Sequence, residues 1–242
     1  MTMSENLKTA VVSGASRGIG AALAVELAKT HHVILTARTE ARLVEVEDRI
    51  HAAGGTATIA PLDLTQYDDI DKLAQAIGGR WSSIDLLVLN AAMLGTLSPL
   101  GHVAPKEFES VMALNVTAQW RMMRAFDPML RRSRGDVVLL TSSVAAGGRA
   151  YWGPYAASKA ALEVLAGSYA DEMRALGVNC LIVDPGGTRT AMRARAFPGE
   201  DPAALKGPEI VAEAIAAQIA EGLAPGLSRI RVGAGGVVAV PA

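Results

Sequence analysis

The feature that most constrains the fold of this chain is the alternation of short apolar runs with longer segments of helical spacing. Runs rich in Val, Ile, Leu and Ala occupy residues 9–15, 32–37, 57–63, 86–92, 137–143 and 179–185. Helical spacing appears at about 18–30, 39–53, 68–79, 105–132, 155–176 and 208–223. Almost entirely apolar strands are typical of a parallel sheet covered on both faces. Because crossovers between parallel strands are right-handed, the sequence predicts a doubly wound α/β fold.

No linker divides the chain, so residues 1–242 are predicted to form a single domain. The segment 186–208 is polar and contains several Pro and Gly residues, which indicates a long loop or lid over a ligand site. At the C-terminus, "RIRVGAGGVVAVPA" predicts one more strand and a short tail.

Composition and charge exclude several classes of partner. The chain has 23 basic and 24 acidic side chains, so it lacks the excess of positive charge that is typical of nucleic-acid-binding proteins. It also has no acidic tail. No apolar run approaches the roughly 18 residues that a membrane span needs, and no signal pattern opens the sequence, so we expect a cytoplasmic protein.

Cys180 is the only cysteine and lies in an apolar run, which indicates a core residue. The four histidines are scattered, so no metal site is predicted.

A glycine-rich motif, "SGASRGIG", follows the first apolar run and opens a helical segment. Gly14, Gly18 and Gly20 would let the backbone turn tightly and approach a pyrophosphate, with Ser16 and Ile19 in the same loop. The free N–H groups of the following helix favour an anion there. The spacing is neither that of a P-loop nor that of G-x-G-x-x-G, and three glycines could also serve the turn alone.

The residues after the second apolar run bear on the choice of cofactor. An acidic side chain there would bind a ribose 2′-hydroxyl, but this chain has Ala37 and Arg38. Arg17 in the glycine motif could reach the same place, and guanidinium groups suit phosphate. Both arginines favour a 2′-phosphate, and therefore NADP(H) over NAD(H). The alternative is that both are solvated surface residues.

Small or polar residues also follow each later apolar run. These positions lie at the carboxyl ends of the predicted strands, where ligands bind in doubly wound sheets. Asp63 could accept a hydrogen bond from an adenine amino group, and Asn90 would lie near the adenosine ribose. The predicted cofactor site also includes Leu64, Ala91, Pro185, Gly186, Thr188 and Thr190.

Taken together, these motifs resemble the short-chain dehydrogenase/reductase family in its single-domain form. The resemblance rests on "SGASRGIG", "LNAAM", "LNVTA", "TSSV", "YAASK" and "DPGGTRT", and it covers nearly the whole chain. It implies a Rossmann-type fold and an oxidoreductase. "RAYWGPYAASK" and "PGGTRTAMRARAFPGEDP" are similar to a bacterial group of undefined substrate. Leu89 and Ala92 depart from the Asn-Asn-Ala-Gly pattern of the family.

The resemblance also implies a catalytic set. Tyr155 and Lys159 are four residues apart and would share one helix face. Tyr155 would be the acid/base, and Lys159 would hold the nicotinamide ribose. Ser142 would orient the substrate oxygen, and Asn115 would hold a water linking Lys159 to solvent.

The phenol of Tyr155 raises a question of proton affinity, because an unperturbed phenol has a pKa near 10. That value is too high for efficient acid–base chemistry at neutral pH. We expect the Lys159 ammonium and the positive ring of the oxidised cofactor to lower the pKa of Tyr155.

The choice between the adjacent serines Ser142 and Ser143 follows from spacing. Ser142 lies 13 residues before Tyr155 and seven after Gly135, as the family resemblance requires. Adjacent residues of an extended segment face opposite ways, so only one serine should reach the substrate. We therefore select Ser142.

The lid region holds residues whose roles stay open. Thr188, through its backbone, and Thr190 would fix the nicotinamide carboxamide, or their hydroxyls would satisfy their own turn. Tyr151 and Trp152 would line the pocket or pack in the core. Arg189, Arg193 and Arg195 would meet an anionic substrate or remain solvated.

The leading prediction is an NADP(H)-dependent enzyme that transfers hydride between nicotinamide and a small-molecule carbonyl or secondary alcohol. A 3-oxoacyl-thioester reductase is the alternative within enzymes, and a non-catalytic NADP(H)-binding redox sensor is the alternative outside them. The resemblance implies a homodimer or homotetramer built through the helices around 105–130 and 155–176.

Overall fold

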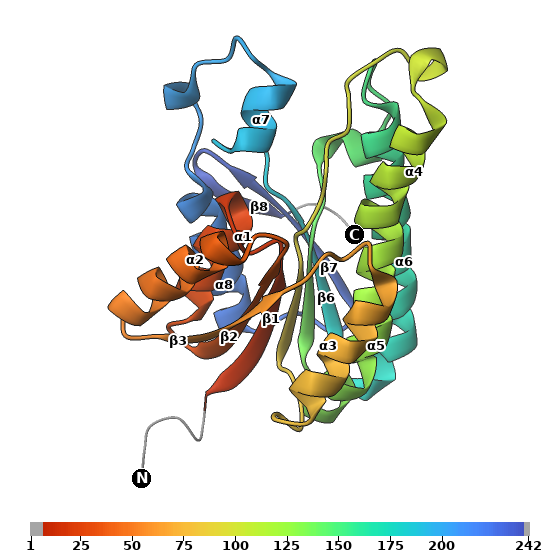
Figure 1. Cartoon of the computed structure of the whole chain (residues 1–242). Helices are drawn as coiled ribbons and strands as arrows, with labels where there is room; N and C mark the ends of the chain where they lie inside the picture. Colours follow the sequence, from red (N-terminus) through yellow and green to blue (C-terminus); the bar gives the residue numbers. More distant parts are fainter. Residues whose placement is uncertain (1–6, 240–242) are drawn as a thin grey trace.

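The computed structural model describes residues 7–239, and its centre is a single sheet with helices on both sides (Figure 1). The strands are β1 (Lys8–Ser13), β2 (His31–Ala37), β3 (Thr56–Pro61), β4 (Leu86–Leu89), β5 (Asp136–Leu140), β6 (Asn179–Asp184), β7 (Leu227–Gly233) and β8 (Gly236–Ala239). They lie in the order β3-β2-β1-β4-β5-β6-β7-β8. The chain reverses direction across the sheet between β3 and β4, which places a switch point beside β1.

The first seven strands run parallel, as the apolar runs predict, and β8 alone runs antiparallel to β7. The C-terminal segment therefore forms two strands, where the sequence predicts one. A two-residue turn after Gly233 allows the reversal, and Gly236 adopts a φ of 113° that disfavours other residues. The expected tail, residues 240–242, lies outside the described residues.

Two groups of helices cover the two faces of the sheet (Figure 1). The helices are α1 (Gly18–Leu27), α2 (Glu40–Ala52), α3 (Tyr67–Gly78), α4 (Pro105–Met112), α5 (Ala118–Ser133), α6 (Gly153–Met173), α7 (Ala191–Ala196) and α8 (Pro208–Glu221). Helices α1, α2 and α8 pack on one face, and α3, α5 and α6 pack on the other. Within residues 7–239, no helix has both the length and the apolar character needed to cross a membrane.

The core consists of two apolar layers, one on each side of the sheet. On the α1 side, Leu23 of α1 and Ile215 of α8 are fully buried among alternate residues of the strands. On the α6 side, Phe126 of α5 and Leu162 of α6 are fully buried. Cys180 belongs to this second layer, as its apolar surroundings in the sequence predict. Each layer anchors the helices that carry the candidate site.

The predicted helix over 105–132 is interrupted by a wider turn. Helix α4 ends at Met112, a π-helical turn spans Ala113–Thr117, and α5 follows. The wider turn coincides with Asn115, whose buried side chain hydrogen-bonds outside the helix. Such turns inside helices are frequent at functional sites.

The segment 186–208, called the lid segment from here on, contains more structure than the predicted loop. It contains α7 and a short 3-10 turn at Pro202–Ala204. The Thr190 hydroxyl caps α7 by accepting a hydrogen bond from the Arg193 N–H. A single β-bridge between Thr188 and Lys206 closes the base of the lid segment. The two ends of the lid segment are therefore held together.

Candidate active site

The glycine loop between β1 and α1 is shaped by the absence of side chains. Gly14 and Gly18 have φ values of 66° and 56°, which other residues rarely adopt. A Cβ on Gly20 would lie 2.3 Å from the Gly14 carbonyl oxygen and 2.4 Å from the Asn90 amide nitrogen. A Cβ on Gly18 would lie 3.4 Å from the Thr190 side chain, which places the lid segment beside the loop.

The first turn of α1 offers backbone donors to an external group. Arg17 precedes the helix in an extended conformation, and its side chain makes no capping hydrogen bond. Because the first N–H groups of a helix lack partners within it, an anion can bind there. Ser16 is half-buried in the same loop, and Ile19 packs against the core.

Asn90 holds the end of β4 against the glycine loop. Its side-chain amide donates to the carbonyl oxygens of Ser13 at 2.9 Å and Gly14 at 3.1 Å. The Ser13 hydroxyl accepts from the backbone N–H groups of Asn90 at 3.0 Å and Ala91 at 3.1 Å. The structure thus brings the two sequence-predicted segments together, and the Asn90 side chain is engaged with the loop backbone.

Arg38 and Asp63 lie close enough for their charges to interact, at the ends of β2 and β3. Burial alone raises the pKa of Asp63, but hydrogen bonds from Thr65 and the Arg38 charge bring that pKa below its usual value. Asp63 Oδ1 accepts from Thr65 at 2.9 Å and 2.7 Å. Leu64 is buried in the core. Arg38 is exposed and forms no ion pair within residues 7–239.

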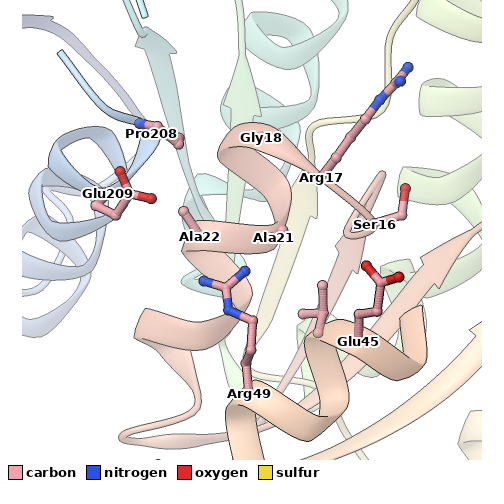
Figure 2. Close-up of a pocket in the computed structure, with 10 residues that line it drawn as sticks. Ser16, Arg17, Gly18, Ala21, Ala22, Glu45, Arg49, Pro208 and Glu209 are labelled. Atoms are coloured by element: carbon pink, nitrogen blue, oxygen red, sulfur yellow. The ribbon is translucent and has the colours of Figure 1, made fainter. Parts of the chain in front are cut away.

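A cavity of about 170 Å³ lies beside the glycine loop, between α1, α2 and the start of α8 (Figure 2). Figure 2 shows Arg49 of α2 reaching toward Ala22, whereas Arg17 points away from both helices. Pockets for small ligands usually measure about 300–1,000 Å³. The cavity is therefore too small for a dinucleotide. Arg17 contributes to its rim, and the guanidinium of Arg17 extends away from it.

Tyr155 and Lys159 lie on one face of α6, and both are buried. The Lys159 ammonium donates to the Leu140 carbonyl oxygen at 2.7 Å, at the end of β5. It also lies 5.8 Å from the centroid of the Tyr155 ring. The predicted pairing of phenol and ammonium is therefore present, and Lys159 fastens α6 to the strand that precedes Ser142.

Burial is the largest influence on the pKa values of Tyr155 and Lys159. It raises the pKa of Tyr155 to about 12, and the nearby Asp184 carboxylate adds to the rise. Burial lowers the pKa of Lys159 to about 8, although the Glu163 carboxylate opposes this change. The expected lowering of the Tyr155 pKa by Lys159 is therefore wrong for the protein alone, because desolvation of the phenolate outweighs the ammonium.

Asn115 braces the loop after β4 against α6. Its Oδ1 accepts from the Met93 N–H at 2.8 Å, and its Nδ2 donates to the Met93 carbonyl oxygen at 2.9 Å. Nδ2 also donates to the Ser158 hydroxyl at 3.0 Å, and Ser158 in turn donates to the Tyr155 carbonyl oxygen. Both Nδ2 hydrogens are therefore engaged within the protein, and the Asn115-bound water stays a prediction.

The two candidate serines differ in exposure. Ser142 has an extended backbone and is half-buried, whereas Ser143 begins a 3-10 turn and is exposed. This difference agrees with the choice of Ser142, whose catalytic role stays a prediction.

The threonines after β6 serve their own turns. The buried Thr188 hydroxyl donates to the Pro185 carbonyl oxygen at 2.9 Å, and the Thr190 hydroxyl caps α7. Gly186 has a φ of 58°, and a Cβ there would lie 2.8 Å from the Val232 carbonyl oxygen. The hydrogen of the Thr188 hydroxyl is therefore engaged within the protein, and the contact of the Thr188 backbone with the nicotinamide carboxamide stays a prediction.

The same residues match a known family. A model described as short chain dehydrogenase matches residues 8–201. This chain belongs to the short-chain dehydrogenase family. It is an oxidoreductase of that family, which confirms the resemblance and the doubly wound fold.

Individual members of the family match along most of their length. The uncharacterized oxidoreductase YciK of Escherichia coli K12 is 40% identical over 209 residues, covering 84% of this chain and 82% of YciK. A Shigella flexneri short chain dehydrogenase solved with NADP is 38% identical, with a TM-score of 0.82 over 85% of this chain and 88% of that one. An Escherichia coli CFT073 short chain dehydrogenase solved with NADPH is 38% identical, with a TM-score of 0.83 over 87% and 90%.

This short-chain dehydrogenase also has a polar network that the sequence analysis missed. The Glu163 carboxylate accepts from the Thr141 hydroxyl, and from Arg229 of β7 at 2.5 Å. Thr141 lies between Leu140, which binds Lys159, and Ser142. Glu163 follows Lys159 by four residues, so the spacing that identified Tyr155 and Lys159 extends one turn further.

Aromatic side chains cover Tyr155 from the lid side. The Trp152 ring lies 6.0 Å from the Tyr155 ring in an edge-on arrangement and 5.7 Å from the Phe197 ring in the lid segment. Tyr151 is exposed and has a φ of 73°, a strained value for this residue. Trp152 thus contacts the candidate catalytic residue, and Tyr151 lies at the surface.

Proposed function

We propose that this protein is an NADP(H)-dependent oxidoreductase that transfers hydride between nicotinamide and a carbonyl or secondary alcohol, with Tyr155 as the acid/base. The observation that carries the proposal is the buried Tyr155–Lys159 pair on α6, fixed to the end of β5 through Leu140. It lies at the carboxyl end of the sheet, where ligands bind in doubly wound folds.

The glycine loop fits the phosphates of a dinucleotide. Gly14, Gly18 and Gly20 leave room for close backbone approach, and the first turn of α1 supplies unpaired N–H groups. Exposed Arg17 and Arg38 supply positive charge for a 2′-phosphate. Two similar proteins were solved with NADP or NADPH. We assign NADP(H) as the cofactor on these grounds.

The remaining predicted cofactor residues complete the site. Asp63, Leu64, Asn90 and Ala91 would flank the adenosine half. Pro185, Gly186 and the Thr188 backbone would meet the nicotinamide half, with Thr190 beside Gly18. When bound, the cofactor donates or accepts the hydride.

In the reducing direction Tyr155 would donate a proton to the developing alkoxide. Burial raises its pKa to about 12, so the phenol of the protein alone is protonated at neutral pH. The positive ring of the oxidised cofactor would lower that pKa toward the range of efficient acid–base chemistry. Lys159 would then return the proton to Tyr155, and Ser142 would hold the substrate oxygen.

We also propose that the chain forms a homodimer or homotetramer through α5 and α6. Trp120 of α5 and Val164 of α6 are exposed although both are apolar, with Val164 at 69% exposure. Apolar side chains at the surface of paired helices suit a helix–helix interface. Light scattering of the purified protein tests this, and a monomer at all concentrations contradicts it.

The function is tested by parallel calorimetric titration with NADPH and NADH, followed by an assay of NADPH oxidation with ketones and aldehydes. We expect tighter binding of NADPH and turnover of at least one carbonyl. Binding of NADPH without turnover across a broad panel would support a redox sensor instead. If neither cofactor binds, the assignment of the glycine loop is wrong.

A further inference from the structure

Three segments bring apolar side chains together around Tyr155. The loop after β4, the loop after β5 and the lid segment contribute to this apolar cluster, together with the start of α6. Its members besides Tyr155 are Leu94, Leu97, Val144, Trp152, Ala156, Met192 and Ala196. Tyr155 itself is only 7% exposed. A substrate whose carbonyl reaches the Tyr155 hydroxyl must therefore place its carbon skeleton against apolar side chains. Such contacts favour an apolar skeleton.

A cation lies at the edge of this apolar cluster. The Arg149 guanidinium lies over two aromatic rings, 5.5 Å from the Trp152 centroid and 5.3 Å from the Phe197 centroid. Trp152 also contacts the Tyr155 ring, so one aromatic ring separates the cation from the candidate acid. A guanidinium over ring faces keeps its N–H donors available for a bidentate oxyanion.

Two arginines of this region differ in their partners. Arg193 lies 3.7 Å from the Phe197 centroid and forms two hydrogen bonds of 2.5 Å with Glu200, so its charge is compensated. Arg149 is exposed and has neither an ion pair nor a hydrogen-bond acceptor for its side chain among residues 7–239. The lid segment adds four basic side chains and only two acidic ones. An anion here meets an uncompensated cation.

We propose that the substrate is an apolar carbonyl compound with a distal oxyanion, a carboxylate or phosphate, which Arg149 binds over the Trp152–Phe197 pair. This assignment rests on the proposed function and names the substrate class of the same site. Tyr151, with its strained φ, lies in the turn between Arg149 and Trp152. One turn therefore positions both side chains that would contact the substrate.

The test uses aldehyde carboxylates with progressively longer alkyl chains, their neutral methyl esters and the corresponding alkyl phosphates, each assayed with NADPH. The wild type should prefer an anionic member over the ester of equal length, by KM. Charge-assisted hydrogen bonds of this kind correspond to roughly a tenfold to hundredfold preference. The better of the carboxylate and phosphate series identifies the anion.

Arg149→Gln should remove this preference, whereas Arg195→Gln, which deletes an equal charge from the lid segment, should keep it. Arg149→Lys should retain only part of it, because an ammonium lacks the bidentate geometry. Equal KM values for ester and anion in the wild type would overturn the inference and leave the proposed function standing. An equal loss of preference in both variants would also overturn it. If the wild type reduces no member of these series but reduces another carbonyl with NADPH, the inference is overturned and the proposed function stands. No turnover of any carbonyl would overturn both.

Discussion

The two halves of the candidate site are built in different ways. Around the glycine loop, the shape comes from backbone and from missing side chains, because a Cβ on Gly20 would collide with the Gly14 carbonyl. Around α6, the shape comes from side chains, because Lys159, Glu163 and Asn115 each bind groups far away in the sequence. Substitutions around the glycine loop should therefore act through steric clashes. Substitutions around α6 should instead act through charge and through the pKa values of the catalytic groups.

The largest expected effect is on the α6 side. Tyr155→Phe should lower kcat/KM for carbonyl reduction by roughly 10²–10⁴-fold, because it removes the proton donor and keeps the ring. NADPH affinity, measured by calorimetry, should change little. Tyr67→Phe, which removes a phenol hydroxyl on α3, is the control. Full activity of Tyr155→Phe would exclude Tyr155 as the acid.

On the glycine-loop side, Gly20→Ala should cost about 1–3 kcal/mol of unfolding free energy, since the added Cβ overpacks the turn. Chemical denaturation measures this loss, and calorimetry should show weaker NADPH binding as well. Gly235→Ala is the matched control, because a Cβ there meets no atom within 4 Å. Equal stability of the two variants would mean that the loop can rearrange.

A smaller effect is expected from the exposed cation at the end of β2. Arg38→Ala should weaken NADPH binding about tenfold and leave NADH binding nearly unchanged, because only the 2′-phosphate needs the charge. Arg42→Ala on the exposed side of α2 removes the same charge and serves as control. A parallel loss for both cofactors would assign Arg38 to another role.

The smallest expected effect concerns the pKa of Lys159. The pKa of Lys159, about 8, should set an alkaline limb in the pH profile of carbonyl reduction, with activity falling as the ammonium is lost. The Glu163 carboxylate raises that pKa, so Glu163→Gln should move the limb to lower pH by less than about one unit. Glu172→Gln on the same helix is the control. A Glu163→Gln variant with lower thermal stability but an unmoved limb would leave Glu163 a purely structural role.

The same division explains what the sequence could predict. The alternation of apolar runs identified β1 to β6 and the residues at their ends, because strand burial and helix periodicity are local properties. Tyr155 and Lys159 were found as a pair because one helical turn relates them. Arg229 was missed because its partner Glu163 lies in another segment. Arg149 was missed because Phe197, one of its two ring partners, lies in the lid segment.

One expectation failed and another lacked a detail, for related physical reasons. The helix predicted over 105–132 is present, but its apolar spacing continues through Asn115, and spacing does not register the wider turn there. The pKa of Tyr155 was expected to fall because the nearby charge was visible in the sequence, whereas the burial that raises it was not. Desolvation depends on tertiary packing, which the sequence does not display.

The π-helical turn at Ala113–Thr117 has a consequence for how the chain tolerates insertions and deletions. A π turn holds one extra residue within a single turn, because its hydrogen bonds run over five residues instead of four. Deleting one residue within the turn would therefore restore a regular helix and keep the buried face of α5, including Phe126, toward the sheet. A deletion elsewhere in α4 or α5 would instead rotate the following side chains by about 100°. The turn is thus the place where this helix can lose a residue without turning α5, and Asn115 lies within it.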